Sequence, residues 1–140
     1  MSDQVLTADD LLAQPKDAYM NEEQHAFFRQ LLLEQRVELQ ARIDGEFKSL
    51  RENEERGSDV ADNGSAEEQR QWQLRLLERE KKLLDKIDQA LDRLADGSYG
   101  WCAETGEPIG LKRLLLRPTA TLSIEAKERE EEKERHVREA

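Results

Sequence analysis

The sequence predicts a mainly α fold: a long antiparallel coiled-coil hairpin, a small globular knob that is zinc-finger-like but lacks its metal, and a C-terminal helix. The composition supports this class, because 39% charged and 36% apolar residues are typical of long, solvent-exposed helices. Two stretches with helical apolar periodicity flank the polar segment 56–66, RGSDVADNGSA. From Ser98 onward, aromatic residues, glycines and prolines replace this periodicity and indicate a compact unit.

The first half of the chain predicts at most one short helical turn within residues 1–20, followed by one long helix. Thr7 and Asp10 have the spacing of a weak capping box before that turn, and Pro15 ends it. Asn21, with Gln24 three residues later, opens a helix that continues to about residue 56. Its apolar residues recur mostly at steps of three, four and seven, so we expect them to form one buried stripe. They are Phe28, Leu32, Leu39, Ile43, Phe47 and Leu50.

Residues 57–65 are expected to form the tip of the hairpin, because glycine, serine and asparagine are frequent there and favour turns. Seven acidic side chains lie between positions 52 and 68, where Arg56 is the single cation. One interpretation is functional: carboxylates on a turn at the end of two helices would present negative charge to a binding partner. Composition alone favours a plainer interpretation, a solvated loop.

A second capping box, Ser65 with Glu68, predicts a helix that ends near Leu94, with Gly97 as its C-cap. Its apolar residues follow a heptad repeat that Glu80 interrupts, which predicts a seam against the first helix. Two helices joined by a short turn run antiparallel, so we expect a hairpin about 45 Å long at ~1.5 Å per residue. The predicted seam residues are Leu76, Leu83, Ile87, Ala90 and Leu94.

The knob is expected to contain tight turns, one helical turn and up to two strands, followed by a charged, exposed helix. Four segments are predicted along the chain: an N-terminal segment (1–21) that packs on the globule, the hairpin (22–96), the knob (97–126) and the C-terminal charged helix (127–140). The apolar side chains expected to hold the knob are Trp101, Ile109, Leu114 and Leu122.

The most specific pattern in the chain is an interrupted metal motif. Four cysteines in the spacing C-x2-C-x17-C-x2-C are a strong zinc signature. Here only the first position is a cysteine. Alanine has no donor atom, and serine and threonine hydroxyls are poor zinc ligands beside a thiolate. We therefore expect no structurally bound metal or cofactor. The four former ligand positions are Cys102, Thr105, Ser123 and Ala126.

Composition and motifs argue against several functions. A formal net charge of -10 makes direct DNA binding an unfavourable interpretation, since such binding relies on lysine and arginine displacing counterions. No apolar run approaches the ~18 residues that a membrane span needs, and a single cysteine fits a reducing compartment, so we expect a cytoplasmic protein. His25 and His136 have no nucleophile beside them, and no phosphate-binding glycine motif occurs, so we expect no enzyme activity.

Five motifs together resemble one known family. They are YMNEEQ at the head of the first helix, Asp59-x-x-Asp62 at the tip, LEREKKLLDKI on the second helix, and YGWCAETGEPIG and RPTATL in the knob. In order and spacing they are similar to the DksA/TraR family of bacterial RNA polymerase secondary-channel regulators, over residues 18–127. The chain departs from the family in its lost zinc ligands and at Gly64, where the family has alanine. It thus resembles a cysteine-poor, zinc-independent member.

The resemblance implies a regulator that inserts its hairpin through the secondary channel of core or holoenzyme RNA polymerase, as a monomer. It places Asp59 and Asp62 near the catalytic magnesium, where they alter open-complex stability, inhibiting ribosomal RNA promoters and activating others. It also implies ppGpp of the stringent response as a co-regulator shared with polymerase. Without the resemblance, the cations concerned would be solvated surface charges. On this analogy the candidate ppGpp residues are Arg79, Leu83, Lys86, Arg117 and Lys127.

Two other functions fit the same hairpin. A Gre-like factor would use the tip to hold a second magnesium and help polymerase cleave backtracked RNA. A coiled-coil adaptor would have no role at polymerase. The knob motifs favour the regulator over the Gre-like factor, and core polymerase binding separates the regulator from the adaptor.

Overall fold

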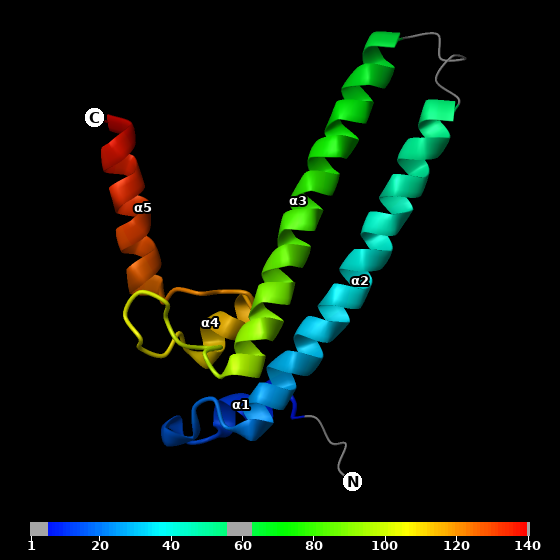
Figure 1. The fold of residues 1–140 in the computed structure, drawn as a ribbon. Coiled ribbons are helices and arrows are strands. Elements are labelled where there is room, and N and C mark those ends of the chain that lie inside the picture. Colours follow the sequence, from blue (N-terminus) through cyan, green and yellow to red (C-terminus); the bar gives the residue numbers. More distant parts are fainter. Residues whose placement is uncertain (1–5, 56–62, 140) are drawn as a thin grey trace. The chain divides into compact units, whose positions relative to one another are not determined.

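A computed structural model describes residues 6–55 and 63–139 of the chain (Figure 1). The described residues are mainly helical and contain no named strand, so the predicted mainly α fold, with a long helical hairpin and a C-terminal helix, is confirmed. They form two compact units, Met1–Leu32 with Gln89–Ala140, and Leu33–Asp88. The helices are α1 (Ala8–Ala13), the 3-10 turn η1 (Lys16–Ala18), α2 (Glu22–Glu55), α3 (Asn63–Asp96), α4 (Leu111–Leu116) and α5 (Ile124–Glu139).

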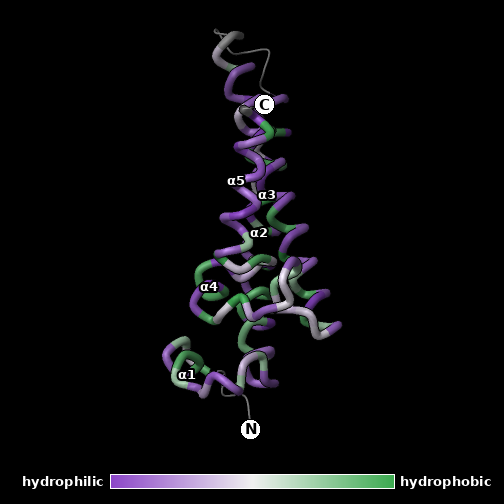
Figure 2. Tube along the Cα trace, turned by 90° about the vertical axis from the view of Figure 1, so that its left-hand side faces the viewer, coloured by the Kyte–Doolittle hydropathy of each residue, from purple (hydrophilic) through white to green (hydrophobic). Residues whose placement is uncertain are grey.

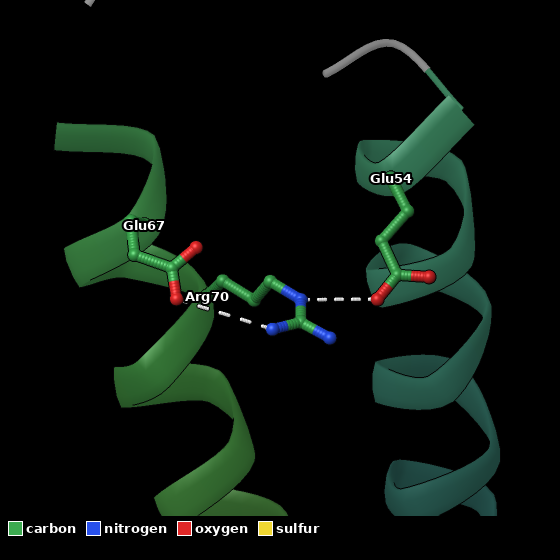
Figure 3. Close-up of polar contacts among 3 residues, drawn as sticks. All are labelled: Glu54, Glu67 and Arg70. Carbon is green, nitrogen blue, oxygen red and sulfur yellow. Dashed lines mark hydrogen bonds and ion pairs between the residues drawn. The ribbon is translucent and has the colours of Figure 1, made fainter. Parts of the chain in front are cut away.

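Within Leu33–Asp88, α2 and α3 lie side by side and antiparallel (Figure 1). In the ion pairs between the two helices, the residue number increases along α2 while it decreases along α3, as antiparallel packing requires. Such pairs on the surface contribute roughly 0–1 kcal/mol each, so most of the pairing energy comes from buried apolar side chains. The ion pairs are Arg36–Asp88 at 2.6 Å, Arg42–Glu80 at 3.6 Å and Glu54–Arg70 at 3.0 Å (Figure 3).

The predicted stripe on α2 is largely confirmed, whereas the predicted seam on α3 is partly wrong. Leu83 is 42% exposed, while Leu77 is buried beside α2. The chain has two neighbouring leucine pairs, 76–77 and 83–84, and both members of each pair satisfy a seven-residue step. In each pair, the leucine that faces α2 is the one on the same side of α3 as the buried residues Glu80 and Ile87. The interruption at Glu80 is therefore part of the interface.

Local capping chemistry defines most helix ends as predicted. The Thr7 hydroxyl accepts a hydrogen bond from the Asp10 N–H at 3.1 Å, and the Asn21 side chain accepts one from the Gln24 N–H at 2.8 Å. Gly97 follows α3 at a φ of 88°, where glycine is favoured. The predicted start at Ser65 is wrong, because α3 already begins at Asn63.

Tyr99 lies at the centre of the unit formed by Met1–Leu32 and Gln89–Ala140. Its ring packs 5.5 Å from that of Phe28, and its hydroxyl donates to the Pro118 carbonyl at 2.8 Å. Leu11 of α1 and Leu114 of α4 are also fully buried, and these two helices contact each other. The N-terminal segment therefore contributes directly to this core, which includes the predicted Leu114.

The structure corrects the predicted knob at two points. Trp101 is 38% exposed, and its ring packs edge-on against that of Tyr19, with the ring centroids 5.2 Å apart. The ring that fills the core is that of Tyr99. In the described part of the chain, the predicted strands reduce to one isolated bridge between Trp101 and Pro108. Ile109 is buried as predicted, and Leu122 is half-buried.

Hydrophobic stretches coincide with α1 and α4, whereas hydrophilic residues prevail along α5 (Figure 2). Ala126 of α5 is fully buried, while Ile124 and Val137 are more than half exposed. Among the residues that the structure describes, no helix combines the length and apolarity of a membrane span.

Candidate functional sites

The interrupted metal motif forms a compact turn held by backbone hydrogen bonds. The Cys102 N–H donates to the Glu107 carbonyl and the Gly106 N–H donates to the Cys102 carbonyl, both at 2.8 Å. On the other side of the turn, the Ser123 hydroxyl accepts from the Ala126 N–H at 3.2 Å, in the first turn of α5. Cys102, Ser123 and Ala126 are all buried. Backbone hydrogen bonds thus hold the segment that carries the first former ligand position.

The Cys102 sulfur sits among hydrogen-bond donors. Burial alone would raise the pKa of its thiol, but the hydroxyl of Thr105 and the N–H groups of Ser123, Thr105 and Glu104 stabilise the thiolate and lower that pKa to about 6. These donors supply hydrogen bonds to the thiolate sulfur, so its negative charge is stabilised without a cation.

The donor set does not fit zinc. A structural zinc site needs four ligands in tetrahedral geometry, and Cys102 offers the single thiolate. Ala126 is fully buried at a former ligand position and presents only a methyl group. Within residues 6–55 and 63–139, no group of three or more His, Cys, Asp or Glu side chains is placed to hold a metal ion.

Chelation should therefore leave the protein folded. We expect the melting temperature in excess EDTA to agree with the untreated value within about 1 °C, because the side chains at the four former ligand positions do not fit zinc. Circular dichroism in both buffers, with metal analysis of the purified protein, makes the measurement. A stoichiometric zinc content, or a large fall in melting temperature on chelation, would contradict the assignment.

The tip aspartates Asp59 and Asp62 lie outside the described residues, so their roles stay predictions. Gly64 lies in the first turn of α3. The helix ends that flank the tip are joined by Arg70, whose Nε lies 3.0 Å from Glu54 and whose Nη1 lies 4.0 Å from Glu67 (Figure 3). This three-residue contact brings α2 and α3 together next to the candidate tip.

The candidate ppGpp residues fall into two groups. Arg79, Leu83 and Lys86 are all exposed and are spaced by four and three residues, so they share one face of α3. The exposure of Leu83, which contradicts its predicted place in the seam, suits this second role. Arg117 is exposed after α4, and Lys127 is half-buried in the first turn of α5. One site combining both groups stays a prediction.

Sequence reasoning missed one chemically unusual contact, in which the carboxyl of Glu46 on α2 meets that of Glu80 on α3. The available signal was the charged residue at a seam position of α3. Its partner depends on the register of the two helices, which the sequence pattern alone left ambiguous.

A helical hairpin combined with a finger-like turn defines a recognisable class of bacterial protein. Residues 24–94 match the family described as "DnaK suppressor protein DksA, N-terminal domain", and residues 97–132 match "Prokaryotic dksA/traR C4-type zinc finger". The chain therefore belongs to the DksA/TraR family. Its second matched segment carries a family description that names four cysteines, of which this sequence keeps one.

Curated relatives and a solved structure agree with this membership. The RNA polymerase-binding transcription factor DksA of Caulobacter vibrioides is 48% identical over 119 residues, covering 85% of this chain and 84% of that protein. The protein of the same name from Escherichia coli K12 is 35% identical over 123 residues, covering 88% and 82%. The structure of transcription factor DksA2 from Pseudomonas aeruginosa is 74% identical, with a TM-score of 0.86 and coverage of 93% and 100%.

Proposed function

We propose that this chain is a transcription regulator that binds RNA polymerase, as core and as holoenzyme, and is not itself an enzyme. The observation that carries the proposal is the 48% identity, over 85% of the chain, to a protein named RNA polymerase-binding transcription factor DksA. The paired helices of Leu33–Asp88 supply the hairpin that such binding requires in this proposal.

In this proposal the hairpin enters the secondary channel, and Asp59 and Asp62 come near the catalytic site. Two carboxylates in a narrow, partly dehydrated channel act on nearby metal ions and cations more strongly than in bulk water. They thereby change the stability of the open complex, inhibiting ribosomal RNA promoters and activating others. The protein acts as a monomer in the bacterial cytoplasm, without direct contact to DNA.

The proposed regulator needs no zinc, because the turn around Cys102 is held by backbone hydrogen bonds. Such a protein can replace a zinc-dependent relative when zinc is scarce. Its domains are proposed as an N-terminal segment (1–21), a hairpin (22–96), a finger-like knob (97–126) and a C-terminal helix (127–140).

Transcription in vitro tests the proposal. Purified polymerase, a ribosomal RNA promoter and the chelator-treated protein are combined with and without ppGpp. We expect inhibition that ppGpp strengthens. No effect from folded protein would overturn the regulator assignment; RNA cleavage in a stalled complex would then favour a Gre-like factor, and failure to bind core polymerase would favour an adaptor.

The ppGpp component has its own test. Lys86→Ala is expected to lower the ppGpp-dependent part of the inhibition about 5–30-fold, because a cation paired with phosphate contributes ~1–2 kcal/mol. Inhibition without ppGpp should stay near the wild-type value. Lys48→Ala, which removes an exposed cation from α2, serves as the matched control. Equal loss with both variants would argue against a specific phosphate contact at Lys86.

A further inference from the structure

Two acidic side chains meet inside the paired part of the hairpin. Glu80 of α3 is only 8% exposed and occupies a seam position, and the carboxyl of Glu46 on α2 lies within hydrogen-bonding reach of it. Carboxylates are almost never buried unless they are paired with a cation or hydrogen-bonded. A buried glutamate in contact with a second, half-buried acid therefore needs an explanation.

The hydrogen bonding of the pair is incomplete if both acids are ionised. Glu46 Oε2 and Glu80 Oε1 are buried and have no donor among the described groups. An ionised carboxylate only accepts hydrogen bonds, whereas a protonated one also donates. One proton held between the two carboxyls would supply the missing donor and join the two helices directly.

The surrounding charges do not neutralise two anions. On α2, Arg42 places its Nε 3.6 Å from Glu80 Oε2, but this side chain is 65% exposed and its charge is screened by water. On α3, the neighbouring Lys81 directs its ammonium over the ring of Phe47, 5.7 Å from the ring centroid. One partly solvated cation thus faces a pair of carboxyls.

The electrostatics of the site agree with this geometry. The hydrogen bond with Glu80, burial, and the charge of Glu80 together raise the pKa of Glu46 to about 7, against a smaller opposing effect of Arg42. Because the two groups interact strongly, this value belongs to the pair and describes the loss of its last proton, the one held between the two carboxyls.

We propose that Glu46 and Glu80 share one proton across the hairpin, and that release of this proton near neutral pH loosens the pairing of α2 and α3 around them. In the unfolded chain, glutamate has a pKa near 4.5, so the folded hairpin holds the proton more tightly. The stabilisation from this proton is complete below pH 4.5 and is lost as the pH rises through about 7.

Thermal unfolding of the full-length chain from pH 5 to pH 8.5 tests the proposal. For the wild type we expect the melting temperature to fall across this range. Glu46→Gln should give a smaller fall and a higher melting temperature at pH 8, because its amide donates a hydrogen bond to Glu80 at every pH. Glu38→Gln, an exposed position on the same helix, should keep the wild-type pH dependence.

Two further measurements address the pair directly. A carbon-13 NMR titration of the glutamate carboxyls should show one midpoint near pH 7, and hydrogen exchange at pH 8, corrected for intrinsic rates, should be slower around positions 46 and 80 in Glu46→Gln than in the wild type. Titration of both carboxyls below pH 5.5, or an unchanged pH dependence in Glu46→Gln, would overturn the proposal. Glu80→Gln provides the same test if Glu46→Gln does not fold.

Discussion

Asp62→Asn is expected to abolish the effect on transcription and to leave polymerase binding nearly unchanged. This result is expected because asparagine keeps the size of the side chain and its compatibility with a turn, while removing the negative charge that the proposed mechanism requires. A promoter assay and a binding assay on the same preparation make the comparison. Inhibition should fall at least tenfold, which corresponds to about 1.4 kcal/mol, whereas the dissociation constant should change less than threefold.

The control for charge is Glu78→Gln, which removes one carboxylate from an exposed position on α3 away from the tip. This variant should keep both binding and inhibition. If Asp62→Asn instead lost binding in proportion to inhibition, the tip would serve only for docking, and the electrostatic mechanism would be wrong.

Tyr99→Ala should produce the largest loss of stability in the chain. It removes a fully buried ring that contacts Phe28 and a hydroxyl that bonds to the Pro118 carbonyl. Truncating a buried aromatic side chain to alanine costs about 3–5 kcal/mol, which is a large fraction of the stability of a small domain. Urea unfolding followed by circular dichroism gives the free energy of unfolding.

Two matched variants separate the contributions at this position. Tyr99→Phe retains the ring but leaves the buried Pro118 carbonyl without the Tyr99 donor, so its cost should be about 1–3 kcal/mol. Trp101→Ala removes a larger aromatic from a partly exposed site and should cost less than Tyr99→Ala. The opposite order of Tyr99→Ala and Trp101→Ala would mean that Trp101, one of the four side chains expected from the sequence to hold the knob, contributes more to the core than Tyr99.

The sequence predicted those parts of the fold that depend on near neighbours in the chain. Thr7 with Asp10, Asn21 with Gln24, and Gly97 marked helix ends correctly, because a cap is made by residues within one turn of each other. Choices between residues that are both apolar needed the partner helix. Leu76 and Leu77 fit the heptad equally well, and only contact with α2 selects Leu77.

The same distinction applies to the candidate sites. The loss of zinc ligands at Thr105, Ser123 and Ala126, beside the retained Cys102, is a prediction from spacing and side-chain chemistry, and it stays a prediction until the metal content is measured. The pairing of Glu46 with Glu80 depends on the register between the two helices, so the sequence pattern alone did not predict it. The choice of Tyr99 over Trp101 as the central ring likewise depends on Phe28, seventy-one positions earlier in the chain.

The turn around Cys102, held by backbone hydrogen bonds, also has a consequence for how the protein folds in the cell. A finger closed by zinc folds only as far as the free metal concentration allows, and each tenfold drop in that concentration costs about 1.4 kcal/mol of its stability. Here the backbone hydrogen bonds from Cys102 to Glu107 and from Gly106 to Cys102 contribute a stability that does not depend on metal concentration. In the zinc-independent regulator proposed above, each new copy of the chain would fold without competing with other proteins for a scarce ion.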